Sequence, residues 1–220
     1  MTRVTSQKSA ASHGPGKARV PRAVREQQML DASVEAFAAN GYHGAGVEEI
    51  AAIAGISKPM IYLYFGSKEE LFVACIRREA GRLMDMIAGV VRAEDPAERQ
   101  LWSALEGFFT FVSDHRGAWT VLYRQARIQG GQSTREVDAM RGRTIDLIGE
   151  LLARAASSEP GPEAVMAAHA LVGACESLAD WMLDNPDTDP KTTAKQLSHF
   201  AWPGLSKLME ATRARQRGEA

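Results

Sequence analysis

The sequence of 220 residues predicts an all-α protein, in which a small N-terminal helix-turn-helix domain precedes a larger helical domain, with about nine helices in total. Two observations support this fold class. Apolar residues after position 21 recur at spacings of three and four, whereas the alternation typical of a half-buried strand is rare. Capping residues, glycine and proline also separate the apolar segments at distances that suit helices.

Proline and glycine bound the first two helices. One helix is expected to begin near Pro21 and to end at Asn40-Gly41, because proline suits a first turn and glycine suits the C′ position. A short helix over 48–54 then ends at Gly55. Gly55 therefore marks a tight turn between two short helices.

The third helix is expected to have Ser57 as its N-cap and to end at Gly66. Its side chains Ile61, Leu63 and Phe65 are expected to supply apolar contacts. Two short helices joined by a glycine turn are typical of a DNA-binding motif, in which the second helix enters the major groove and the first one braces it.

Ser67 and Glu70 have the spacing of a capping box, which opens a long helix to about Val91. Five further helices are expected over residues 97–113, 118–128, 133–156, 163–183 and 192–211.

Charge is unevenly distributed along the chain. Residues 1–25 contain six Lys or Arg and no Asp or Glu, although the net charge of the whole chain is −1. This basic arm suits contact with a nucleic acid, and a solvated, disordered tail is the alternative.

Several classes of protein are excluded by what the sequence lacks. Cys75 and Cys175 are too few for a disulfide framework, no stretch reaches the roughly 20 apolar residues of a membrane span, and no secretory signal opens the chain. No nucleophile elbow, phosphate loop or metal-binding spacing occurs, and the five histidines have no i, i+4 pairing. We therefore expect a cytoplasmic protein that is not an enzyme and needs no metal or cofactor.

The helix-turn-helix segment resembles the signature of the TetR (tetracycline-repressor-like) family of transcriptional regulators. The matching run is Ile50-Ala51-x-x-Ala54-Gly55-Ile56-Ser57-x-x-x-x-Tyr62-x-Tyr64-Phe65-x-Ser67-Lys68-x-x-Leu71, and Phe37-x-x-x-Gly41-Tyr42 also fits. The resemblance covers roughly residues 22–75. It implies a disordered arm over 1–20, a DNA-binding domain over 21–70, a helical ligand-binding and dimerisation domain over 71–212, and a tail over 213–220.

The resemblance implies contacts with double-stranded DNA from the recognition helix and from the start of the helix that follows it. The contacting residues would be Ser57, Lys58, Pro59, Met60, Tyr62, Tyr64 and Lys68. Ser57 and Lys58 would meet phosphate or base edges, with Lys58 hydrogen-bonding guanine, while Pro59 and Met60 would meet bases by shape. The tyrosine hydroxyls would donate to phosphates, and Lys68 would hold a phosphate beside a helix N-terminus.

Two positions depart from the family pattern. Gly46 stands where a Thr or Ser commonly opens the second helix, so one cap and one phosphate contact are missing. Met60 stands where the family often has Thr, and a methionine contacts a thymine methyl without donating a hydrogen bond.

The resemblance also implies a pocket for a largely apolar small-molecule effector. Its candidate lining is Trp102, Phe108, Phe109, Trp119, Tyr123, Met140, Met166 and Cys175, and an ordinary helical core is the alternative. Because Phe108, Phe109 and Phe111 cannot share one helix face, at least one of them is expected to face solvent, a partner or a cavity.

By the same resemblance, the last two helices pair with their copies across a two-fold axis, and the homodimer presents two recognition helices to a pseudo-palindromic operator. The leading hypothesis is a repressor that a small molecule releases from its operator. Two alternatives remain open. One is a helical small-molecule or protein-binding module with weak DNA affinity, and the other is a redox-responsive regulator that uses Cys75 or Cys175.

Overall fold

The computed structural model describes residues 21–218, and within that range every regular element is a helix, as the sequence predicts. The elements are α1 (Arg22–Gly44), α2 (Val47–Ile53), α3 (Lys58–Phe65), α4 (Lys68–Val90), α5 (Ala97–Asp114), α6 (Arg116–Trp119), the π-helix η1 (Thr120–Gln125), α7 (Ala126–Gln129), α8 (Gly131–Ala155), α9 (Pro162–Asp184) and α10 (Pro190–Gln216). The expected basic arm over 1–20 lies outside the described residues.

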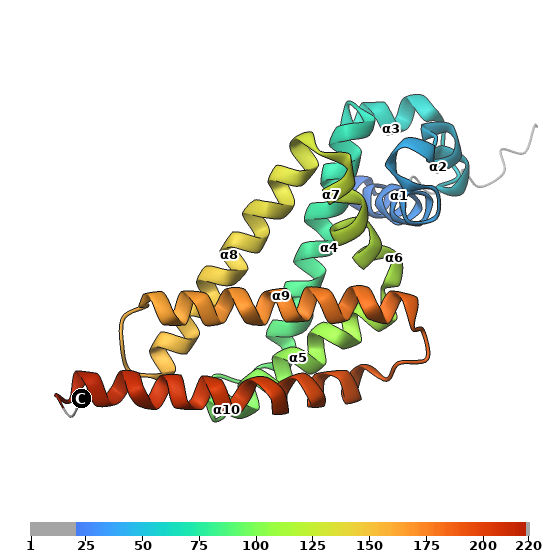
Figure 1. Cartoon of the computed structure of the whole chain (residues 1–220). Coiled ribbons are helices and arrows are strands. Elements are labelled where there is room, and N and C mark those ends of the chain that lie inside the picture. The colour runs from blue at the N-terminus through green and yellow to red at the C-terminus, as the bar shows by residue number, and fades with distance from the viewer. Residues whose placement is uncertain (1–20, 219–220) are drawn as a thin grey trace, which may run out of the picture.

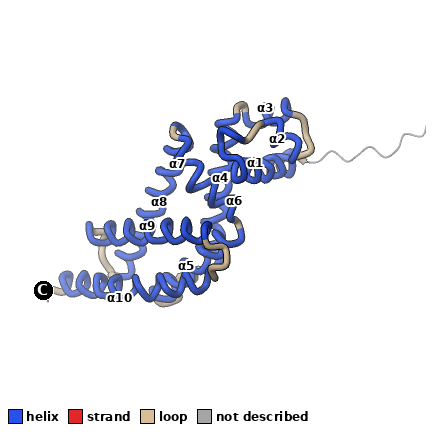
Figure 2. Tube along the Cα trace, turned by 45° about the vertical axis from the view of Figure 1, so that its right-hand side comes forward, coloured by secondary structure: helices blue, strands red, loops and turns tan. Residues whose placement is uncertain are grey.

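Helices α1 to α3 form a small head at one end of the molecule, and the long helix α4 connects this head to the body (Figure 1). In the body, α9 and α10 run side by side and α5 packs against α10, while α8 packs against α9 and α4 (Figure 2). The recognition helix α3 therefore lies far from the α9–α10 pair.

The head is held by a core of side chains from α1 to α4. Phe37 and Phe72 meet edge to face with ring centroids 4.9 Å apart, and Ile50, Ile61 and Leu71 are fully buried around them. The three helices of the head are thus fixed to α4 by one apolar cluster.

Two glycines shape the head. Gly41 has φ +70° and interrupts α1 where the sequence predicts its end, after which one further turn runs to Gly44. Gly55 has φ +65° and makes the turn between α2 and α3, since a side chain there would be strained.

The two serine caps behave differently. Ser67 caps α4 as expected, because its Oγ accepts a hydrogen bond of 3.1 Å from the backbone N–H of Glu70. Ser57 occupies the N-cap position of α3, but its side chain makes no capping bond. Pro59 has no N–H, and the N–H of Met60 donates to the backbone carbonyl of Ser57, so neither of the two donors that an N-cap side chain usually bonds is available to the hydroxyl.

The three phenylalanines of α5 lie on different faces of the helix, as expected. Phe109 and Phe111 are fully buried in different clusters, and the half-buried Phe108 packs against Phe109 and Trp119. Phe108 is thus the one ring of the three that is not fully buried.

The segment expected as one helix over 118–128 is divided into α6, η1 and α7. The middle part is a π-helix from Thr120 to Gln125, a rare conformation that is frequent at functional sites.

Candidate nucleic-acid interface and effector site

The recognition helix α3 buries one side and exposes the other. Ile61 is fully buried and Phe65 packs against the head core, whereas Tyr62 is 39% and Leu63 is 75% exposed. The expectation that Leu63 packs inward is therefore wrong. Ile61 and Phe65 are one helical turn apart and share the inner face, and Leu63 lies between them on the opposite face.

The seven predicted DNA-contacting residues lie on one continuous stretch from the N-cap of α3 to the first residue of α4. Ser57, Pro59 and Tyr62 are exposed, whereas Lys58, Met60, Tyr64 and Lys68 are half-buried. The structure thus brings together all seven residues.

Lys58 forms an ion pair with Glu48, which links the first turn of α3 to the first turn of α2. The hydrogen bond with Glu48 raises the pKa of Lys58 and lowers the pKa of Glu48. The Lys58 ammonium also lies 5.9 Å from the centroid of the Tyr62 ring. The residue expected to read guanine is therefore already held by a carboxylate.

Two aromatic rings of the head lie beside cations. The Arg22 guanidinium carbon is 5.0 Å from the centroid of the Tyr64 ring, and the Lys68 ammonium is 4.8 Å from the centroid of the Tyr42 ring. Burial lowers the pKa of Lys68. Arg22 was not predicted as a site residue, although the basic residues around the start of α1 give this part of the sequence a positive charge.

The first turn of α2 compensates for the missing Thr or Ser. Glu49 accepts a hydrogen bond of 3.4 Å from the backbone N–H of Gly46 and one of 2.8 Å from the Asn40 side chain. This carboxylate satisfies one free donor of the helix start and anchors α2 to α1.

Four of the eight predicted pocket residues form a continuous row of rings. Phe108 lies 5.0 Å from Phe109 and 5.3 Å from Trp119, and Trp119 stacks on Tyr123 at 5.1 Å with an interplanar angle of 12°. Trp119 is 5% exposed, and its indole Nε1 has no hydrogen-bond partner. A buried N–H without an acceptor is costly, so this donor is a feature that an effector can satisfy.

The other four predicted pocket residues are not part of this row. Met140 packs against the head core, Cys175 packs against the same cluster as Phe108 and Phe109, and the Arg99 guanidinium lies 5.4 Å from the Trp102 ring. Met166 is 67% exposed on α9. These four residues do not join the row of rings.

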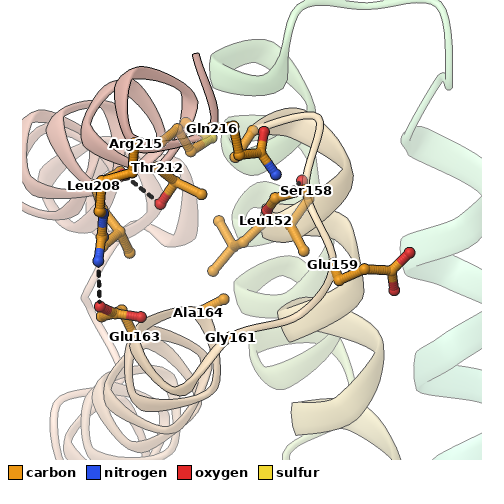
Figure 3. A pocket seen from close by; sticks show the side chains of 13 residues that line it. Leu152, Ser158, Glu159, Gly161, Glu163, Ala164, Leu208, Thr212, Arg215 and Gln216 are labelled. Atoms are coloured by element: carbon orange, nitrogen blue, oxygen red, sulfur yellow. Dashed lines mark hydrogen bonds and ion pairs between the residues drawn. The ribbon is translucent and has the colours of Figure 1, made fainter. Parts of the chain in front are cut away.

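Two hollows in the described surface lie away from the predicted pocket residues. One of about 390 Å³ lies between the ends of α8, α9 and α10, where Figure 3 shows Arg215 bonded to Glu163 across its rim. The other, of about 250 Å³, lies between α1, α4 and the segment after α5. Neither hollow is lined by any of the eight residues.

The π-helix η1 is a functional candidate that sequence reasoning missed, since no sequence pattern marks a π turn. Its Arg124 donates to Asp184 of α9 at 3.0 Å and also bonds Asp180. Its Gln125 lies against Gly41 in α1, and its Tyr123 stacks on Trp119. One element therefore touches the head, the row of rings and α9.

Within residues 21–218, no group of His, Cys, Asp and Glu is placed so that it could hold a metal ion. Within the same range, no helix is long and apolar enough to span a membrane.

Comparison with known proteins gives two matches to family models. Residues 29–75 match the model described as bacterial regulatory proteins, tetR family, and residues 97–204 match the tetracyclin repressor-like C-terminal domain.

Among solved structures, the chain is similar to a TetR-like transcriptional regulator from Rhodococcus sp. RHA1. The two are 45% identical, the match covers 86% of this chain and 99% of that one, and the TM-score is 0.73. FadR of Bacillus subtilis, solved in complex with stearoyl-CoA, is 19% identical and covers 80% of this chain and 96% of its own, with a TM-score of 0.71. The second match shows the fold alone.

Among curated proteins, the chain is 29% identical to the transcriptional activator FasR of Mycolicibacterium smegmatis, over 86% of this chain and 87% of FasR. It is also 29% identical to the fatty acid metabolism regulator protein of Bacillus subtilis, over 50% of this chain and 58% of that protein.

Proposed function

Because this chain belongs to the TetR family of DNA-binding transcriptional regulators, we propose that it represses genes beside a pseudo-palindromic operator and leaves that operator when a largely apolar effector binds its body. The observation that carries the effector half of this proposal is the buried, unpartnered Nε1–H of Trp119 in the row of rings. The seven residues from Ser57 to Lys68 carry the DNA half.

The effector we propose has a long acyl chain and a polar acceptor. Leu83 and Leu183 pack against the cluster that contains Trp119, so aromatic and aliphatic groups surround this point. A carbonyl oxygen would satisfy the indole N–H, and the chain would replace contacts among the rings. Support for an acyl compound comes from the 29% identity to a fatty acid metabolism regulator over half of this chain.

Communication between effector and DNA is proposed to pass through η1. Tyr123 stacks on Trp119, and Val121 and Leu122 are buried in the cluster that holds the head. A ligand that moves the Trp119–Tyr123 stack therefore moves a segment packed against α1 and α4. A coupling free energy of about 1–3 kcal/mol would change DNA affinity by about 5–150-fold.

The dimer we propose forms through the outer faces of α9 and α10. Met166, Trp181 and Phe200 are 67%, 49% and 84% exposed, and all three are large apolar side chains on these two helices. Covering them in a two-fold interface removes apolar surface from water. Met166 therefore fits the dimer face better than the effector site.

Activation is the second candidate, because the relative that matches most of this chain among the curated proteins described above is named an activator. Repressor and activator bind the operator by the same head, and they differ in whether the bound protein lowers or raises transcription of the adjacent gene. The redox alternative has little support, because burial raises the pKa of both Cys75 and Cys175 to about 12.

The test uses the full-length protein and an operator recovered by enriching genomic fragments of the source organism. Gel shifts over a range of salt should give a steep fall in affinity, because phosphate contacts release counterions. A flat salt response would contradict the DNA-binding role and favour a small-molecule or protein-binding module.

Stearoyl-CoA, stearate and free CoA are then titrated into the protein–operator complex. Release by stearoyl-CoA or stearate, and not by CoA, is the expected result, and tighter binding with an acyl compound would contradict release by the effector. Trp119→Phe keeps an aromatic ring and removes the N–H, so it should weaken the effector response about tenfold while operator affinity without effector stays the same. An unchanged effector response in Trp119→Phe would contradict this site.

A further inference from the structure

Glu48 forms an ion pair with Lys58, a residue that we expect to contact DNA. Positive charge suits DNA contact, so the negative charge of Glu48 at this place needs a separate explanation. Both side chains are open to solvent, with 70% of Glu48 and 42% of Lys58 exposed. An exposed pair of this kind contributes little to stability. A carboxylate near phosphates also weakens DNA binding by repulsion, so the pair has a cost in the complex.

The two adjacent glutamates of α2 have different contacts. Glu49 bonds Asn40 and the N–H of Gly46, and thereby caps α2 and ties it to α1. Glu48 instead reaches across to the first residue of α3. Its carboxylate thus stands beside the ammonium that begins the recognition helix.

The pair has the hydrogen-bonding pattern that complements a G·C base pair. In the major groove, guanine presents the acceptors O6 and N7, and the N4 amino group of cytosine is a donor beside O6. Lysine donates to the guanine acceptors, and a glutamate accepts from cytosine N4. A donor and an acceptor held side by side by their own ion pair can meet both bases at once.

We propose that Glu48 is a specificity-determining residue, whose carboxylate accepts a hydrogen bond from cytosine N4 while Lys58 donates to the guanine of the same base pair. This inference rests on the proposed operator binding and adds an acidic reader to it. An A·T pair also has two acceptors, adenine N7 and thymine O4, but the N6 donor lies between them, whereas guanine presents its two acceptors side by side to the lysine, and this difference favours G·C.

The pairing with Glu48 also makes Lys58 selective. On non-cognate DNA the ammonium keeps its carboxylate partner, so it gains little from a phosphate while Glu48 is repelled by it. On the cognate base pair both groups find new partners. The Glu48–Lys58 ion pair therefore lowers the affinity for non-cognate sequences more than the affinity for the cognate one. A repulsive element of this kind produces specificity.

The experiment selects binding sites from a random-sequence DNA duplex library with the full-length wild-type protein and with Glu48→Ala, Lys58→Met and the double variant. Glu69→Gln is the matched control, because Glu69 is an exposed acid in the first turn of α4, beside the head, and forms no ion pair with another described residue. Binding constants are then measured for the best duplex and for its variants with one base pair changed. Circular dichroism checks that each variant is folded.

The duplexes selected by the wild type should all have a G·C pair at one position of each half-site. The wild type should bind about tenfold more weakly when that base pair is changed to A·T. Glu48→Ala and Lys58→Met should each reduce this penalty to about twofold at the same base pair, and the double variant should reduce it no further. Glu48→Ala should also bind non-cognate duplexes more tightly. Glu69→Gln should keep the full base preference.

Three results would overturn the assignment of Glu48. The first is an unchanged base preference in Glu48→Ala, which would leave the residue as an electrostatic brake. The second is loss of preference at a base pair different from the one that Lys58→Met affects. The third is a fixed A·T pair at the shared position. If the wild type enriches no sequence at all, the operator-binding proposal fails instead, so the two failures are distinct.

Discussion

Gln125 of η1 lies directly against Gly41, the kinked position of α1. A Cβ added to Gly41 would be 3.1 Å from the Gln125 Oε1 atom, and the backbone there has φ +70°. The π-helix of the body is therefore in contact with the point where the first helix of the head changes direction.

Gly41→Ala is expected to destabilise the protein by about 1–3 kcal/mol, because a side chain is strained at this φ and also crowds Gln125. Combining it with Gln125→Ala should recover only the part that comes from crowding. Urea unfolding of each variant at equal dimer concentration measures both effects. A full recovery in the double variant would show that the backbone conformation costs nothing.

The buried carboxylate of Glu79 is expected to be essential for stability. Glu79 is 0% exposed and bonds Arg78 at 2.7 Å and Arg82 at 3.0 Å. Glu79→Ala leaves the largely buried Arg78 without this partner and should cost about 3–5 kcal/mol in unfolding free energy. Asp31→Ala removes the exposed partner of Arg78 and should cost less than about 1 kcal/mol. Equal costs for the two variants would contradict the role of burial.

Both thiols are expected to be unreactive near neutral pH, because burial raises the pKa of Cys75 and of Cys175 to about 12. The fully buried Cys75 should therefore resist alkylation more strongly than the half-buried Cys175, and operator affinity should be unchanged under oxidant. Unfolded thiols ionise from about pH 9 upward, so the stability that their burial provides is complete below that pH and is lost as pH rises towards 12. Release of DNA by oxidant, absent in a Cys75→Ser, Cys175→Ser variant, would restore the redox hypothesis.

Lys68→Ala should weaken binding to all DNA sequences to a similar degree, because a phosphate contact positions the protein without reading bases. The slope of log affinity against log salt should fall by about one unit for each protomer. Tyr62→Phe should likewise weaken every sequence, with a smaller change of slope because its hydroxyl is neutral. A change of base preference in either variant would show that the residue reads sequence.

Phe200→Glu should separate the proposed dimer, because Phe200 is 84% exposed on α10 and a charge there opposes burial. Sedimentation should give a monomer, and operator affinity should fall by more than tenfold since one head then binds one half-site. Lys195→Glu, also exposed on α10, is the control and should remain a dimer. A dimer in Phe200→Glu would place the interface elsewhere.

Much of the head follows from local sequence signals. The glycines at 41, 55 and 66 all have positive φ, and the Ser67–Glu70 cap forms as expected. These features depend on residues within one helical turn of each other, so a single sequence contains their cause. The exposure of Leu63 was missed because a helix of eight residues buries only one narrow face.

The sequence by itself determined the all-α class, most helix boundaries and the stretch from Ser57 to Lys68 that we propose as the DNA contact. Only the tertiary structure decided that Glu48 pairs with Lys58, that the Trp119 N–H lacks an acceptor, and that residues 120–125 wind as a π-helix. The physical reason is the range of the interactions. Caps and turns act between near neighbours, whereas ring contacts, unpartnered donors and the π turn depend on how α4, α5 and α9 pack around residues distant in sequence.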